Sequence, residues 1–129
     1  MKIVIVFWVG VCDTLLVMKT YLLNINYKAK IQVLLGANAD EILENPVING
    51  LDPEVLVIDS EVDEGTVNVV PDSPDFFNVD IRMKVTIECE ECEEDKLQDI
   101  VEGGLEFDMN NLFAVWDWEV YGWGVESVK

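Results

Sequence analysis

The chain has 129 residues, a length typical of one domain. It carries 26 acidic residues against 8 basic ones and no histidine, for a formal net charge of −18, although half of its residues are apolar. The apolar content excludes an acidic disordered tail, and the sign of the charge excludes a protein that follows phosphate backbones with Lys and Arg. Without histidine, Ser-His-Asp and Cys-His catalysis are excluded as well.

The N-terminal 17 residues consist of one Lys followed by an apolar run. A signal peptide begins in the same way, but Asp13 interrupts the run and no small-residue cleavage site follows. The run is also too short for a helix that spans a membrane. The β-branched and aromatic residues from Ile3 to Val9 predict a buried strand, placed centrally or in a second layer. As an alternative, Met18 is the natural start and the preceding residues are an extension.

Two long stretches alternate between apolar and polar residues with the period of a half-buried strand. The odd-numbered positions from Tyr21 to Leu35 are all apolar, as are those from Phe77 to Cys89. Polar residues occupy most positions between them. We therefore expect two long strands, each with one face on the core and the other in water.

A short helix is expected after each long strand. The first covers residues 39–44, with Asn38 as its N-cap and Pro46 as its stop. The second covers residues 93–102 and ends at Gly103-Gly104, which allow a left-handed cap conformation.

Further strands are expected after the helices, over residues 55–62 and 112–121, with an additional short strand over residues 67–70. Residues 71–74, Pro-Asp-Ser-Pro, predict a turn-rich connector. The expected fold is α+β: an antiparallel or mixed sheet built from two strand–helix–strand units, with short helices on one face and an extra apolar N-terminal strand.

The two halves of the chain resemble each other, which predicts an internal repeat of residues 20–70 and 76–129 within one domain. Several residues recur at a constant offset of 54: Asn24, Lys28, Lys30, Ile31, Val33 and Leu43 correspond to Asn78, Arg82, Lys84, Val85, Ile87 and Leu97.

Charge is distributed unevenly along the chain. Residues 1–37 carry four lysines and one aspartate, a net charge of +3, whereas residues 38–129 carry 25 acids and four bases, a net charge of −21. If the second helix continued through this region, acids at helical spacing would form one stripe: Glu91, Asp95, Asp99, Glu102 and Glu106. The alternative interpretation is a solvated surface that only keeps the protein soluble.

The three cysteines are too few for a disulfide framework, so a reducing cytoplasm is the expected compartment. Cys89-Glu-Glu-Cys92 has the spacing of a redox pair, but the surrounding glutamates would raise the thiol pKa values. A zinc site would need Cys12 as a third ligand or a second pair from a dimer. The favoured interpretation is a core-face strand residue at Cys89, with no metal and no cofactor.

Aromatic residues gather near the C-terminus, and Trp116, Trp118 and Val120 are expected to share one strand face. Core packing is the favoured role, and a partner contact that includes Tyr121 and Trp123 is the alternative. The sequence contains no phosphate-binding glycine loop, nucleophile elbow or nucleotide-binding fingerprint, so we expect no enzyme and no catalytic residues.

These features predict an acidic inhibitor that imitates nucleic-acid charge and blocks a basic nucleic-acid-binding partner. In size and charge alone the chain is similar to small phage-encoded anti-CRISPR and anti-restriction proteins, which implies a viral protein in the host cytoplasm. No direct contact with nucleic acid or membrane is expected. The alternative is a non-catalytic accessory protein that self-associates, with a homodimer left open. The acids expected to stand in for phosphates are Glu90, Glu91, Glu93, Glu94, Asp95, Asp99 and Glu102, supported by Asp59, Glu61, Asp63 and Glu64.

Overall fold

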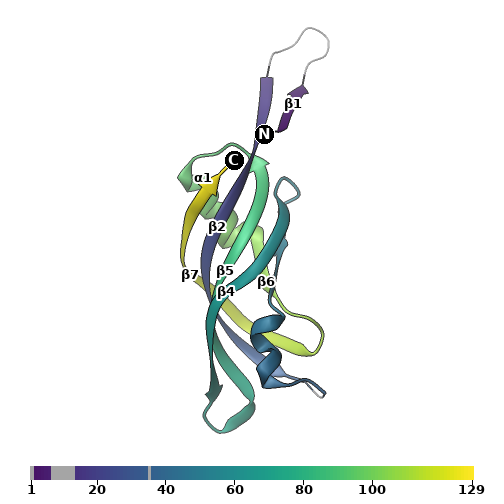
Figure 1. Cartoon of the computed structure of the whole chain (residues 1–129), viewed down its shortest axis with the longest axis vertical. Coiled ribbons are helices and arrows are strands. Elements are labelled where there is room, and N and C mark those ends of the chain that lie inside the picture. Colours follow the sequence, from purple (N-terminus) through teal and green to yellow (C-terminus); the bar gives the residue numbers. More distant parts are fainter. Residues whose placement is uncertain (1, 7–13, 35) are drawn as a thin grey trace.

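A long, strongly twisted antiparallel sheet carries a thin second layer on one of its faces (Figure 1). A computed structural model describes residues 2–6, 14–34 and 36–129, with side chains for residues 18–34 and 36–129. The elements in chain order are β1 (Lys2–Val6), β2 (Thr14–Val33), the 3-10 helix η1 (Ala39–Glu44), β3 (Val47–Gly50), β4 (Leu56–Val70), β5 (Ser73–Glu90), α1 (Glu94–Asp99), the π turn η2 (Ile100–Gly104), β6 (Leu105–Asp108) and β7 (Phe113–Val128).

Strands β2 and β5 form the centre of the main sheet. They pair from Met18 opposite Glu90 to Gln32 opposite Phe76. Strand β4 lies along the outer side of β5 and β7 along the outer side of β2, so the strand order is β4–β5–β2–β7. Every pairing among the described strands is antiparallel, which resolves the expected choice between an antiparallel and a mixed sheet.

The alternation predicted for the two central strands is confirmed. The odd-numbered residues from Tyr21 to Ile31 and from Val79 to Cys89 are buried. Even-numbered residues between them point to the opposite face, which no other element covers in the described part of the chain, and we call it the open face. Because the apolar side chains of both strands point to one side, they form a continuous wall of the core.

A second layer closes the core on the covered face. Strands β3 and β6 pair there as a small antiparallel sheet, which contributes Ile48 and Phe107. The short helices add Ile42 from η1 and Leu97 from α1 to the same cluster. The expected class, a sheet-rich α+β fold with few short helices, is therefore confirmed.

The first helix was predicted correctly, and the second only in part. Asn38 caps η1 by accepting a hydrogen bond from the backbone N–H of Asp40, at 3.5 Å. The second helix is α-helical only over Glu94–Asp99 and continues as the π turn. The left-handed cap predicted at Gly103-Gly104 is wrong, because neither glycine has a positive φ. Buried Ile100 and Val101 hold this turn against the core, and β6 follows at once.

The connector predicted over residues 71–74 is shorter than expected. The β4–β5 hairpin turns at Pro71 and at Asp72, whose φ of 63° is left-handed, and Pro74 already belongs to β5. Residues 67–70 are the end of β4 and do not form a separate strand.

Both outer strands contain β-bulges, residues with no partner opposite them. In β7 the register shifts leave Trp116, Tyr121 and Glu126 as the extra residues, one every five positions. In β4 the extra residues are Ile58 and Asp63. Bulges increase the local twist of a strand, which agrees with the coiled outline of the sheet in Figure 1.

The N-terminal strand does not lie where the sequence predicted it. β1 pairs only with residues 14–18 of β2, beyond the end of β7, so it is neither central nor in a second layer. The paired ribbon extends past the rest of the sheet, and the start of β1 and the C-terminus lie near its base (Figure 1). Residues 7–9 of the predicted strand, and its predicted burial, lie outside the described residues and side chains. No helix in the described ranges is long and apolar enough to cross a membrane.

Candidate functional site

Seven of the acids expected to contact a partner gather where β5 leads into α1, and we call them the junction acids. All seven are exposed, and none forms an ion pair with another described residue. Lys96 is the one basic residue in this segment. The junction acids are Glu90, Glu91, Glu93, Glu94, Asp95, Asp99 and Glu102.

The single acidic stripe expected from helical spacing is interrupted. Asp95 and Asp99 lie one turn apart on α1, but Glu91 precedes the helix and half-buried Glu106 belongs to β6. The helix is only six residues long because buried residues follow it directly and bring the chain back to the core. The junction acids are thus a cluster on a bend of the chain and not a regular row.

The four supporting acids lie on another surface. Asp59, Glu61, Asp63 and Glu64 all belong to β4, where Glu61 stands opposite Lys84 and Glu64 opposite Arg82 on the open face. Helix α1 instead packs in the layer on the covered face. The structure therefore does not bring the eleven predicted acids into one surface.

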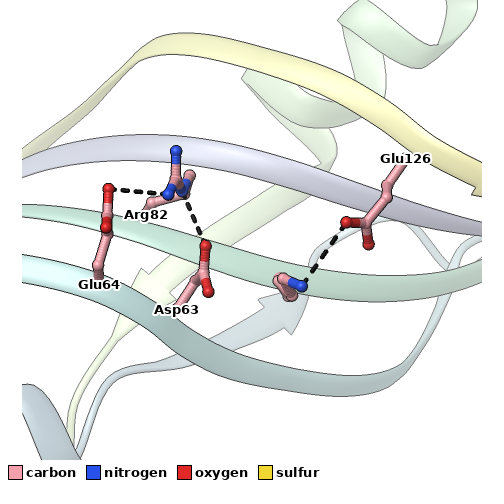
Figure 2. Close-up of polar contacts among 5 residues, drawn as sticks. Asp63, Glu64, Arg82 and Glu126 are labelled. Atoms are coloured by element: carbon pink, nitrogen blue, oxygen red, sulfur yellow. Dashed lines mark hydrogen bonds and ion pairs between the residues drawn. The ribbon is translucent and has the colours of Figure 1, made fainter.

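Two of the four acids on β4 are already paired within the protein (Figure 2). Arg82 donates from Nε to Asp63 Oδ2 at 2.9 Å and lies 2.8 Å from Glu64 through its second guanidinium nitrogen. The bulge at Asp63 allows two consecutive carboxylates to reach one guanidinium. Lys84 and Glu126 form a longer pair, 3.6 Å between Nζ and Oε1. Exposed pairs of this kind contribute at most about 1 kcal/mol each, but they lower the charge that β4 presents.

A cavity of about 530 Å³ opens beside the junction acids, and we call it the junction cavity. Cys89 and Cys92 lie in its wall with Glu90, Glu91 and Lys96. The structure adds two acids that the sequence analysis missed, Asp52 and Glu54, from the connection between β3 and β4. Nothing in the local sequence marks these two, because only the packing of the second layer brings them to the end of β5.

The two cysteines of the junction cavity differ in exposure. Cys89 is buried, and Cys92 is half-buried with its backbone N–H donating to the Tyr21 hydroxyl at 3.1 Å. Burial, together with the nearby Cys92 and Asp52, raises the pKa of the Cys89 thiol to about 12. The expected core-face position of Cys89 is confirmed, while the rise in its pKa comes first from burial.

A metal at the cysteine pair finds no support in the described ranges. There, no group of three or more Cys, Asp or Glu side chains is arranged to hold a metal ion. Cys12, the third ligand weighed for zinc, lies outside the described residues.

Trp118 and Val120 share the core face of β7 as expected, but Trp116 does not, so the expectation is wrong for that residue. The bulge at Trp116 turns its side chain to the open face, where 63 % of it is exposed and its indole N–H donates to Gln32 Oε1 at 2.9 Å. Trp118 packs against the core, with its ring centroid 5.8 Å from that of Tyr27. The period of two predicts both residues on one face only when no extra residue intervenes.

Comparison with protein families, curated proteins and solved structures finds no match for this chain. A function can therefore be inferred only from the surfaces of the protein. Of these, the junction acids and the junction cavity combine exposed charge without ion pairs and one half-buried thiol, that of Cys92.

Proposed function

We propose that the protein is a non-enzymatic acidic binding protein that occupies the basic groove of a nucleic-acid-binding partner. The junction acids support this proposal, because seven exposed carboxylates lie on one short segment without an ion pair among the described residues. Such charge costs stability through self-repulsion, and a basic partner would relieve it. The same carboxylates would steer the partner during association and make binding sensitive to salt.

The contact surface that we propose differs from the one expected from sequence. Duplex DNA carries one charge per about 1.7 Å of axis, whereas Asp95 and Asp99 are separated by about 6 Å along α1. Asp52 and Glu54 increase the density because they line the junction cavity beside Glu90 and Glu91. We therefore assign these two to the surface in place of the acids on β4.

Charge reversal separates this surface from the general acidity of the chain. The test variant combines Glu91→Lys, Asp95→Lys and Asp99→Lys. The matched control reverses three exposed acids near the other end of the sheet, Asp40, Glu44 and Asp75, and changes the net charge equally.

Each full-length protein is immobilised, incubated with a cell lysate at low salt and eluted with a salt gradient. The proposal requires that the wild type and the control retain nucleic-acid-binding proteins, that added duplex DNA displaces them, and that the test variant does not retain them. Equal loss of retained proteins in both variants would mean that the acids act only through nonspecific charge. Retention that duplex DNA does not affect would exclude imitation of nucleic acid.

We also propose that the two halves of the chain are related units, residues 20–70 and 76–129. The strand register supports this proposal. At an offset of 54, Asn24 corresponds to Asn78 and Lys30 to Lys84. Asn24 pairs with Lys84 and Lys30 with Asn78, so the two pairs exchange under a two-fold rotation about the pair Tyr27–Ile81.

A further inference from the structure

The junction cavity places two thiols beside each other at the end of a rigid strand. Cys89 is the penultimate residue of β5 and 3 % exposed, and Cys92 follows in the connection to α1. Both residues line the junction cavity and are separated by only two residues along the chain. The Tyr21 hydroxyl holds the backbone N–H of Cys92 at 3.1 Å, which fixes this connection to β2.

We propose that Cys89 and Cys92 are a redox-active dithiol that closes to a disulfide by exchange with small disulfides entering the junction cavity. The Cys92 thiolate attacks one sulfur of RSSR and releases RS⁻, leaving a mixed disulfide on Cys92. Cys89 then loses its proton and attacks the Cys92 sulfur, and the second RS⁻ leaves. Two protein thiols and one RSSR give one protein disulfide and two RSH, since the released thiolates take up the two thiol protons.

The exposure of the two residues assigns their order in this reaction. Cys92 is half-buried on the wall of the cavity, so an incoming disulfide reaches its sulfur first. Cys89 is buried in the core, so it reacts only with the Cys92 sulfur, after Cys92 has formed the mixed disulfide. The high pKa of the Cys89 thiol makes it slow toward free oxidants, and it fits the second, intramolecular step, in which the Cys92 sulfur is held in the same cavity wall.

The charge of the cavity decides which oxidants enter it. Asp52, Glu54, Glu90 and Glu91 place four carboxylates around the thiols, against the single ammonium of Lys96. A cationic disulfide is attracted into such a cleft and an anionic one is repelled, with effects on rate of about ten-fold or more at low salt. The structure thus points to selection of cationic disulfides over the glutathione disulfide, which carries a net negative charge.

The raised pKa of the Cys89 thiol also predicts that the disulfide, once formed, opens slowly. A thiol of high pKa is a poor leaving group, and the reduced form gains no stability from a thiolate. The same four carboxylates also repel anionic glutathione, which slows its reduction of the disulfide. The pair therefore acts as a slow switch and not as an oxidising catalyst, in keeping with the acidic surroundings of the motif.

The test uses the full-length chain with Cys12→Ser, which leaves only the two thiols in question. The protein is exposed to cystamine or to oxidised glutathione at equal concentration, quenched with acid, alkylated and weighed by intact-mass spectrometry. We expect cystamine to convert both thiols to a disulfide, about 2 Da lighter and without alkyl groups. Its rate should exceed that of oxidised glutathione by about ten-fold or more, and 1 M salt should reduce this ratio.

Two pairs of substitutions keep the outcome decisive. Glu90→Gln with Glu91→Gln should lower the preference for cystamine, whereas Glu93→Gln with Glu94→Gln, outside the cavity lining, should preserve it. Cys89→Ser should stop at a mixed disulfide on Cys92, and Cys92→Ser should leave Cys89 unreactive while the protein is folded.

Two alkylated thiols after cystamine treatment, or a mixed disulfide that never resolves in the protein with both cysteines, would overturn the dithiol assignment. Equal rates with both oxidants would overturn the role of the carboxylates. None of these outcomes depends on the partner-binding proposal.

Discussion

Removing the hydroxyl of Tyr27 should stabilise the protein, contrary to the usual effect of this substitution at a buried tyrosine. Tyr27 is fully buried, and its hydroxyl has no hydrogen-bond partner among the described residues. Tyr21, also buried and on the same strand, accepts a hydrogen bond from the Cys92 N–H at 3.1 Å. Tyr27→Phe and Tyr21→Phe therefore remove the same atom from two environments that differ in this bond.

The magnitudes follow from the cost of burying unpaired polar groups. An unsatisfied buried donor or acceptor costs about 1–3 kcal/mol. Removal of the Tyr27 hydroxyl removes this penalty, but it also removes the packing contacts of the oxygen atom. We expect Tyr27→Phe to gain about 1 kcal/mol in the free energy of unfolding, or roughly 4 °C in the midpoint of thermal unfolding. Tyr21→Phe leaves the Cys92 N–H without its partner and should lose about 1 kcal/mol.

Urea unfolding at neutral pH, followed by tryptophan fluorescence, measures both changes against the wild type. The slope with urea should stay constant, so that a shifted midpoint reports stability and not a change in the unfolded state. A loss of stability in Tyr27→Phe as large as that in Tyr21→Phe would refute this prediction. That result would mean that a buried water or another group satisfies the Tyr27 hydroxyl.

Three further predictions test other features. Above pH 9 the unfolded chain loses the Cys89 proton, whereas the folded chain keeps it to about pH 12, so stability should fall across this window. The fall, measured by urea midpoints, should be smaller in Cys89→Ala, and an equal slope would contradict the buried thiol. Gly65→Ala should cost about 1–3 kcal/mol, because its Cβ would lie 2.9 Å from a Leu43 methyl carbon, while Gly124→Ala, with nothing within 4 Å, should be neutral in the same assay. A circular permutant of residues 18–129 can start at Asp72, with Lys129 joined by a short turn to Met18. It should fold with the circular dichroism spectrum of linear residues 18–129, because the Lys129 and Thr20 backbones exchange hydrogen bonds of 2.8 and 2.9 Å. Failure to fold would contradict the proposed unit boundaries.

The central strands and the first helix were predictable because their signals are local. Alternation from Tyr21 to Ile31 places each side chain by the pleat alone, whatever partner the strand takes. Asn38 caps η1 through a bond to a residue two positions away. Such features require no knowledge of the rest of the fold.

The errors have a common cause, which is dependence on partners distant in sequence. Trp116 lies on the open face because it is an extra residue of β7, with no residue of β2 opposite it. The alternation of residues within β7 gives no sign of this bulge. The acids on β4 face Arg82 through register with β5, and Asp52 reaches Cys89 through the second layer. The candidate surface could therefore be predicted for the contiguous junction acids and not for the residues that complete it.

The bulges of the outer strands have a consequence for the protein in concentrated solution. β4 and β7 are long, and each leaves one backbone edge unpaired within the described part of the chain. A strand of another molecule that docks on β7 can form regular backbone hydrogen bonds over only a few residues. The bulge at Trp116, Tyr121 or Glu126 then shifts the register. Acidic side chains along both edges add like-charge repulsion between copies. Irregular pairing and charge thus discourage edge-to-edge fibrillar growth, and near the isoelectric point of about 4.1 the irregular pairing alone provides this protection.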